Sequence, residues 1–179
     1  MNIWQRITQV AQAIVLVLPM SCAQTIPADK PQLKNPEYDA RLQRLLSFST
    51  PLIGVEALHE KQDEVYLMDT RSREEFEVSH IEGARYLGYR NLEESALDGI
   101  PKEAEIVLYC SVGYRSEKIG NRLRKMGYTN VTNLYGSIFE WVNHGYPLVT
   151  PAGTTTDSLH TYNKNWSQWV NAPAVKKIW

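Results

Sequence analysis

Residues 105–116 read EIVLYCSVGYRS, an apolar run that leads directly into a short polar loop. The run up to Tyr109 is typical of a buried strand, and the pattern over 116–126, closed by Gly127, predicts a helix. A strand, a tight loop and a helix N-terminus place free backbone amides and the positive end of the helix dipole around one point. We therefore expect an anion-stabilising site in this loop.

Cys110 is the candidate nucleophile of that loop. A free thiol titrates near ~8.5, and a helix N-terminus or a nearby cation lowers its pKa to about 3.5–7.5. Arg115 supplies the cation, and Gly113 allows the backbone to curl so that its amides face inward. A small, inert, buried residue is the common fate of a free cysteine. The glycine and arginine that follow Cys110 favour a functional role instead.

Short apolar runs alternate with helical patterns along the rest of the chain. Strands are predicted over 64–68, 84–87, 105–109 and 130–134, and helices over 36–48, 72–78, 91–97, 116–126 and 137–143. Ser72 is the expected N-cap of the second helix, with Glu75 three residues on as in a capping box. Because this alternation builds βαβ units, we expect an α/β fold with a central parallel sheet flanked by helices.

Composition excludes several other classes of protein. The chain has 179 residues, with 19 Lys and Arg against 20 Asp and Glu, so it lacks the basic surface that nucleic-acid binding requires. Its hydrophobic and charged fractions, 43% and 22%, are those of an ordinary globular protein. Two cysteines and four scattered histidines predict neither a disulfide scaffold nor a metal site, and no cofactor motif is present.

The N-terminus has the pattern of an export signal. Residues 10–20 are apolar, too short to span a bilayer easily, and Ser21-Cys22-Ala23 offers small residues for cleavage. We expect residues 1–23 to be a signal peptide that directs the protein to the periplasm or cell envelope; an uncleaved anchor or an amphipathic first helix is the alternative. Residues 18–22 loosely resemble a lipoprotein box, so removal of Cys22 and a lipid anchor on it both stay open.

The remaining segments divide the chain. Residues 24–50, with several prolines, read as a linker and an N-terminal helix, residues 51–150 as the α/β domain, and residues 151–179 as a C-terminal helical extension. The extension carries one apolar stripe at helical spacing, with Asp157 or Ser158 as N-cap: Leu159, Tyr162, Trp166, Trp169 and Val170. The stripe is expected to pack on the domain, and a docking face for a partner is the alternative.

The loop resembles the C-x-x-G-x-R-S active loop of single-domain rhodaneses. Its residues are Cys110, Ser111, Val112, Gly113, Tyr114, Arg115 and Ser116. Asp69-Thr-Arg71, Glu75-Phe76 and His80-Ile-Glu-Gly83-Ala84 are similar to that family's D-x-R, E-[FY] and G-H-I-x-G-A motifs. The likeness covers about residues 50–150 in order. Ser79 and Ser137 depart from it, since glycine is usual at both positions.

The resemblance implies a persulfide on Cys110, formed from a small sulfur donor such as thiosulfate and passed to a thiophilic acceptor. The amides of residues 111–115 would cradle the sulfur, and Arg115 would attract an anionic donor. Asp69 and Arg71 are expected to form an ion pair that supports the loop. The related phosphatases and arsenate reductases use one residue more than the six from Cys110 to Arg115. An idle module that binds a partner is the other alternative, and such modules typically lose the cysteine.

Overall fold

The computed structural model describes residues 25–179. The predicted signal peptide and Cys22 therefore lie outside the described residues. In the part of the chain that is described, no helix combines the length and the apolar character needed to cross a membrane.

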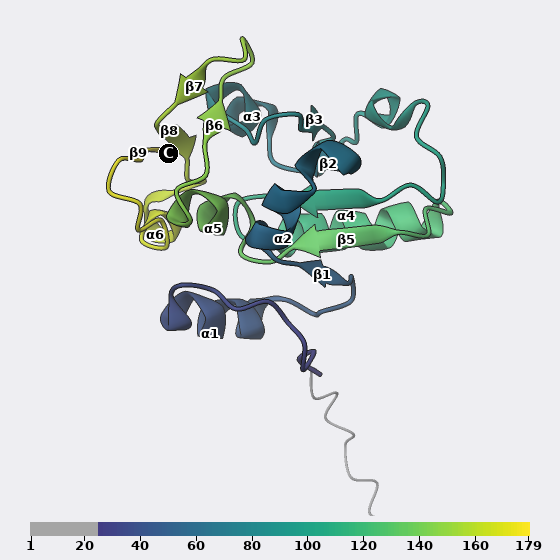
Figure 1. Ribbon diagram of the computed structural model, residues 1–179, viewed down its shortest axis with the longest axis horizontal. Helices are drawn as coiled ribbons and strands as arrows, with labels where there is room; N and C mark the ends of the chain where they lie inside the picture. The colour runs from purple at the N-terminus through teal and green to yellow at the C-terminus, as the bar shows by residue number, and fades with distance from the viewer. Residues whose placement is uncertain (1–24) are drawn as a thin grey trace, which may run out of the picture.

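Five strands form one parallel sheet at the centre of the fold (Figure 1). Its order is β1-β5-β4-β2-β3. The strands are β1 (Leu52–Ile53), β2 (Tyr66–Asp69), β3 (Arg85–Tyr86), β4 (Ile106–Tyr109) and β5 (Val131–Leu134). The predicted strands are thus confirmed as a parallel sheet, and β1 is the one strand of it that the sequence pattern did not indicate.

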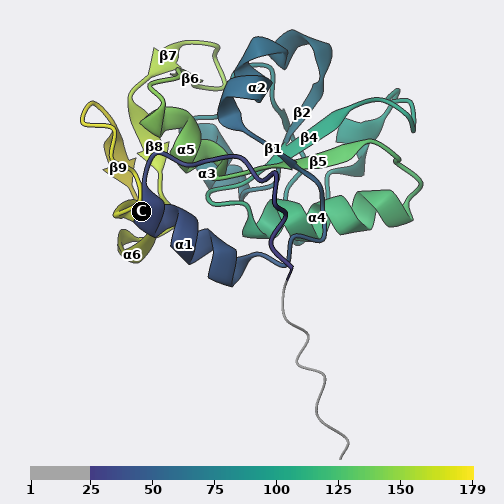
Figure 2. The same cartoon turned by 60° about the horizontal axis from the view of Figure 1, so that its bottom comes forward.

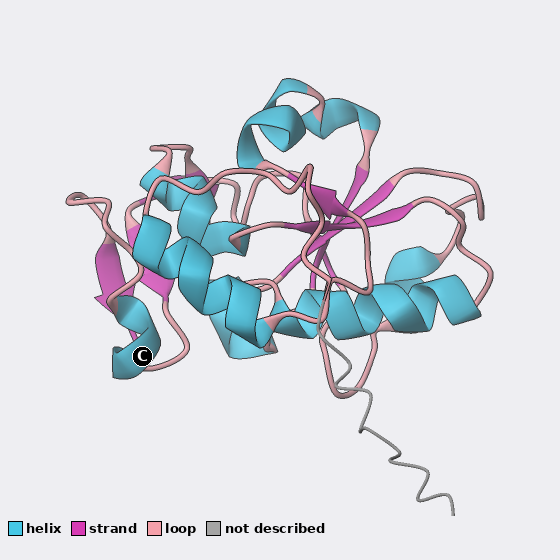
Figure 3. Ribbon diagram, turned by 90° about the horizontal axis from the view of Figure 1, so that it is seen from below, coloured by secondary structure: helices cyan, strands magenta, loops and turns pink. Residues whose placement is uncertain are grey.

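Side chains of successive strand residues enter two different cores. In β2 and β4, Leu67 and Val107 belong to one buried cluster, and Met68 and Leu108 belong to the other. Because both faces of the sheet are covered, β4 is apolar throughout and all four of its residues are buried. Helices α2 (Val55–Glu60) and α4 (Tyr114–Lys125) lie on opposite sides of the twisted sheet (Figures 2 and 3).

The helices of the α/β domain follow the sequence with small shifts. The α3 helix (Arg73–Val78) begins at the predicted capping box of Ser72 and Glu75. The α4 helix starts at Tyr114, two residues before the predicted Ser116, because Gly113 takes a left-handed conformation with φ 103° and serves as N-cap. The α5 helix spans Ser137–Asn143 as predicted. Two short 3-10 helices span Gln62–Glu64 and Glu94–Leu97, the second inside the helix expected over 91–97.

The segment before the sheet is held against the domain. The α1 helix (Pro36–Leu45) is capped by Asn35 and ends earlier than residue 48. Its buried Tyr38 donates a hydrogen bond to the carbonyl of Gly136, 3.0 Å away, at the start of α5. Lys30 forms an ion pair with Asp39 at 2.8 Å. Residues 25–35 lack regular secondary structure, yet these contacts tie them to the fold.

The prediction of a single helix over residues 157–170 is wrong. The hairpin β6 (Leu148–Val149) and β7 (Thr155–Thr156) leads into β8 (Ser158–His160), which pairs in parallel with β9 (Lys176–Ile178). Only α6 (Lys164–Ser167) is helical, and Asn163 caps it rather than residue 157 or 158. The apolar spacing resembled that of a helix because Leu159 and Val170 pack in the same core. Leu159 lies on a strand, however, and Val170 follows α6.

The tail covers one end of the sheet beside α5 (Figure 1). Leu159 and Val170 are 0% and 1% exposed, and Trp166 and Trp169 pack against the same cluster. The Trp169 ring stacks on Tyr38 of α1, with ring centroids 5.5 Å apart. Four of the five stripe residues are therefore covered by the domain and by α1, whereas Tyr162 is 54% exposed.

Gly120 allows α4 to lie close to the buried Thr50. A Cβ atom added there would lie 2.7 Å from Oγ1 and 2.8 Å from Cγ2 of Thr50. Ordinarily alanine stabilises a helix relative to glycine by about 0.8–1 kcal/mol. Here we expect Gly120→Ala to lower the free energy of unfolding by about 1–3 kcal/mol, because Thr50 is 1% exposed and has no room to move.

A double-mutant cycle in urea checks this expectation. In a Thr50→Ala background the clashing atoms are gone, and Gly120→Ala should then be neutral or stabilising. Equal destabilisation in both backgrounds would contradict the steric explanation.

Candidate active site

Cys110 lies at the carboxyl edge of the parallel sheet, between β4 and α4. The β2 strand ends at the same edge with Asp69, and α5 begins there after Gly136. The α5 amides of Ile138 and Phe139 donate to the carbonyls of Cys110 and Ser111, each at 3.3 Å. Open α/β sheets hold their ligands at this edge.

Backbone amides converge on the sulfur of Cys110. The Gly113 amide donates to Sγ across 3.2 Å, as the turn into α4 brings it back over the sulfur. The loop itself is held by Asn133 of β5, whose side-chain amide donates to the Gly113 carbonyl at 3.0 Å. The Gly113 amide thus faces the sulfur, in line with the inward curl predicted at this glycine.

The surroundings of Cys110 favour its thiolate. Burial, at 1% exposure, disfavours ionisation, but the charge of Arg115 opposes burial. The amides of Ser116, Val112 and Gly113 add to that effect, and the pKa of Cys110 falls below its ordinary value. A cysteine buried for packing alone would show the opposite shift.

Glu75 fixes the guanidinium of Arg115. The two side chains form a bidentate pair, with Nη1–Oε2 and Nη2–Oε1 distances of 2.6 and 2.8 Å. Ser111 joins the pair, accepting from Arg115 at 2.9 Å and donating to Glu75 at 2.9 Å. Burial alone would raise the pKa of Glu75, yet Arg115 and the Ser72 amide lower it to about 2.

Arg115 is therefore engaged on both of its terminal nitrogens. From the sequence, Arg115 is predicted to attract an anionic donor; in the fold its terminal nitrogens bond Glu75 and Ser111. Its positive charge remains close enough to Cys110 to lower the pKa of the thiol. The sequence pattern indicates Glu75 only as a capping residue, and its bond to Arg115 is a second role. The signal for that role is its match to the glutamate of the family's E-[FY] motif.

Asp69 and Arg71 form a fully buried ion pair behind the loop. The Arg71 Nη2 lies 2.6 Å from Oδ2 of Asp69, and the same nitrogen donates to the Ser79 carbonyl at 2.6 Å. Burial opposes the charge of Arg71, but Asp69 holds its pKa above the ordinary value. The pair fixes the turn after β2 to the end of α3. Of the two residues, only Arg71 lines the cavity.

The two departures from the usual glycines have simple local explanations. Ser79 has φ −173°, which is extended backbone open to any residue. Ser137 has φ 55°, in the left-handed region that glycine favours. Its Oγ accepts a hydrogen bond from the Cys110 amide at 3.0 Å. That bond offsets strain at Ser137 and ties α5 to the nucleophile.

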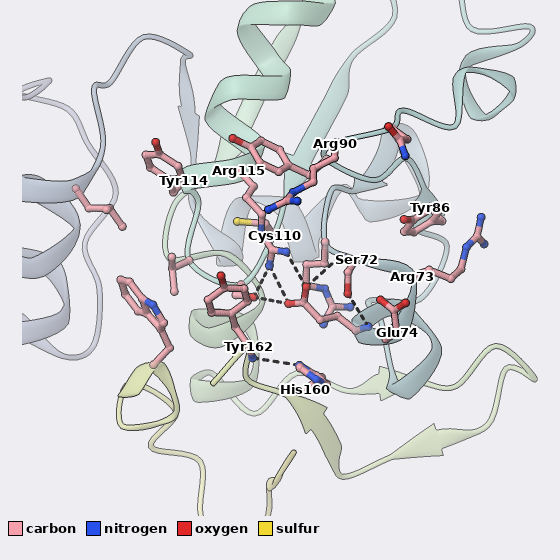
Figure 4. A pocket seen from close by; sticks show the side chains of 18 residues that line it. Ser72, Arg73, Glu74, Tyr86, Arg90, Cys110, Tyr114, Arg115, His160 and Tyr162 are labelled. Atoms are coloured by element: carbon pink, nitrogen blue, oxygen red, sulfur yellow. Dashed lines mark hydrogen bonds and ion pairs between the residues drawn. The ribbon is translucent and has the colours of Figure 1, made fainter. Parts of the chain in front are cut away.

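A cavity of about 920 Å³ opens over Cys110 (Figure 4). Of the predicted loop residues, Cys110, Ser111, Val112, Tyr114 and Arg115 line it, while Gly113 contributes its amide from behind. Three further lining residues come from the tail: His160, Tyr162 and Trp166. No sequence pattern indicates that the tail reaches the site, because only the fold of β8 brings it there.

Known proteins are similar to this chain over the same region. Residues 54–144, about half of the chain, match the rhodanese-like domain family. A protein named Sulfurtransferase from Allochromatium vinosum is 36% identical over 91 residues, which cover 51% of this chain and 84% of that protein. Thiosulfate sulfurtransferase GlpE of Coxiella burnetii is 27% identical over 84 residues, 47% of this chain and 78% of that protein.

Solved structures agree on the fold. The rhodanese-like domain of the Alr3790 protein from Anabaena sp. superimposes with a TM-score of 0.52 at 24% identity, covering 58% of this chain and 86% of that one. The BH2092 protein from Bacillus halodurans also gives a TM-score of 0.52, at 20% identity, over 66% of this chain and 89% of its own. The family match, the parallel sheet and the cysteine loop at its carboxyl edge lead to one conclusion: the chain belongs to the rhodanese-like domain family, whose named relatives here are sulfurtransferases.

Proposed function

We propose that the protein transfers sulfur through a persulfide on Cys110, taking it from a thiosulfate-like donor and passing it to a thiophilic acceptor. The observation that supports this most is the thiol of lowered pKa at the N-terminus of α4, under the Gly113 amide. A thiolate is the form that attacks a sulfane sulfur. The sulfurtransferase-named relatives support the same class of reaction.

The proposed reaction has two balanced steps. The Cys110 thiolate attacks the outer sulfur of thiosulfate; a new S–S bond forms, the donor's S–S bond breaks, and sulfite leaves with the electron pair. The product, Cys–S–S⁻, carries a negative charge one atom further out, where loop amides can stabilise it. An acceptor such as cyanide then attacks the outer sulfur, leaves as thiocyanate and restores the thiolate. No redox partner is required.

The alternative function is that of a module that binds a partner without catalysis. Retention of Cys110 with its amides and its arginine disfavours it, because an idle module has no need to lower the pKa of a thiol. A phosphatase or arsenate reductase fits less well, since the loop from Cys110 to Arg115 has six residues where those enzymes use one more. Export through residues 1–23 remains a proposal based on the sequence pattern.

Cys110→Ser should abolish sulfur transfer and leave the fold intact. A serine hydroxyl does not ionise near neutral pH and forms no persulfide, whereas its size fits the same loop. Cyanide-dependent thiocyanate release from thiosulfate measures the transfer, with p-nitrophenyl phosphate as the phosphatase control. Ping-pong kinetics are expected, with the half-reaction product one sulfur atom heavier on Cys110 by intact mass.

Three results would contradict parts of this proposal. Transfer that survives in Cys110→Ser removes the persulfide step. Phosphate release that depends on Cys110, without sulfur transfer, favours the phosphatase. A folded protein inactive with every donor favours the binding module. The same mass measurement on material from the native host shows whether residues 1–23 are absent or Cys22 carries acyl chains.

Arg115→Ala should raise the pKa of Cys110, because the variant removes the largest influence that opposes burial of the thiolate. The pH dependence of Cys110 alkylation by iodoacetamide measures that pKa directly, without a sulfur donor. Arg122→Ala is the matched control, since Arg122 lies on the same helix and pairs with Glu94 at the surface. An unchanged alkylation profile in Arg115→Ala would mean that the loop amides suffice.

Glu75→Gln should make the free energy of unfolding less dependent on pH under acidic conditions. With a pKa of about 2 in the folded protein, Glu75 contributes stability above its ordinary pKa, and this is lost as pH falls from about 4.3 toward 2. The difference corresponds to about 3 kcal/mol. Thermal unfolding between pH 7 and pH 2 measures it, and Glu77→Gln, an exposed change on the same helix, is the control. A parallel decline in wild type and Glu75→Gln would contradict this assignment.

A further inference from the structure

The tail places aromatic side chains at the site from outside the family domain. The match to the family ends at residue 144, whereas Tyr162 and Trp166 line the cavity over Cys110. Tyr162 and Trp166 join aromatic residues of the domain in this lining: Tyr86, Tyr89 and Tyr114. The β8 strand sets the position of the tail, because its core residue Leu159 is fully buried.

Tyr162 is held in an unfavourable conformation at the mouth of the cavity. Its φ is 65°, a value that bulky side chains rarely adopt. Its amide donates to Nδ1 of His160 at 3.2 Å, and its ring lies 5.4 Å from the Arg115 guanidinium (Figure 4). Because the residue is 54% exposed, core packing does not explain the strain. An exposed, strained aromatic residue beside a reactive sulfur points to a role at the site.

The cavity is also much larger than thiosulfate requires. At about 920 Å³ it lies near the upper end of the roughly 300–1,000 Å³ found for ligand pockets. Thiosulfate is a small inorganic dianion with no apolar part to contact aromatic rings. Arg115, the cation next to Cys110, already has its terminal nitrogens bonded to Glu75 and Ser111. Besides the aromatic rings, Arg90 also lines the cavity, so the space beyond Cys110 suits a donor that joins an anionic sulfur group to an apolar body.

We propose that Tyr162 and Trp166 form an aromatic subsite that favours organic sulfane-sulfur donors with an apolar or aromatic body over thiosulfate. This inference rests on the proposed sulfur transfer and names its substrate class. A thiosulfonate, R–SO₂–S⁻, represents that class: Cys110 attacks the outer sulfur, the S–S bond breaks, and the sulfinate R–SO₂⁻ leaves with the electron pair. The R group then occupies the aromatic subsite. Stacking of aromatic groups contributes beyond simple burial.

The experiment compares thiosulfate, methanethiosulfonate and benzenethiosulfonate as donors, with cyanide as acceptor. Donors differ in intrinsic reactivity, so the readout is the change in the benzene-to-methane ratio of kcat/KM between wild type and Tyr162→Asn. Asparagine tolerates the left-handed backbone but lacks the ring. We expect the ratio to fall about five- to tenfold, through a higher KM for the benzene compound. Tyr162→Phe should keep the ratio.

A matched control and a binding measurement complete the test. Trp179→Ala removes an aromatic residue of the same extension that is 57% exposed and does not line the cavity, so the ratio should not change. Benzenesulfonate lacks the transferable sulfur, and calorimetry of its binding measures the subsite without turnover. It should bind wild type more tightly than Tyr162→Asn.

The outcomes separate the two proposals. An active wild type whose donor ratio is the same in Tyr162→Asn overturns the subsite and leaves sulfur transfer standing. Benzenesulfonate that binds both proteins equally overturns the subsite as well. No transfer from any donor, together with binding that depends on Tyr162, supports the subsite and overturns the proposed sulfur transfer.

Discussion

The bidentate ion pair between Glu75 and Arg115 is the interaction on which the site depends. It joins the first turn of α3 to the first turn of α4, two helices that follow neighbouring strands of the sheet. Ser111, in the loop, hydrogen-bonds both partners of the pair. Burying such a charged pair costs desolvation free energy. Its role here is to hold a positive charge beside the Cys110 sulfur.

Several buried polar side chains lie at the carboxyl edge of the sheet and bond the loop or the residues that support it. Asp69 and Arg71 brace the turn after β2, and Ser137 receives the Cys110 amide. The central strand β4 is apolar on both faces up to this edge. These polar interactions lie where charge must be stabilised, and packing on both sides of the sheet keeps the amides in position.

The tail shows how an extension can change a site without touching its nucleophile. Leu159 anchors β8 in the core, so the backbone that follows must turn sharply, and Tyr162 takes the strained position at the cavity mouth. The family domain supplies the reactive sulfur and its cradle, and the tail supplies part of the wall around the incoming group. The proposed sulfur transfer and the proposed choice of donor are thus assigned to different segments of one chain.

The sequence by itself determined the α/β alternation, the parallel sheet and Cys110 at a helix N-terminus, because these depend on local patterns: apolar runs, a capping box and a glycine in a tight loop. Only tertiary structure decided that Glu75 binds Arg115, forty positions away in the chain, and that Tyr162 reaches the cavity. The prediction of a tail helix was wrong for the same reason. Helical spacing records which residues are apolar, whereas pairing of β8 with β9 and the burial of Leu159 depend on surfaces that exist only once the chain has folded.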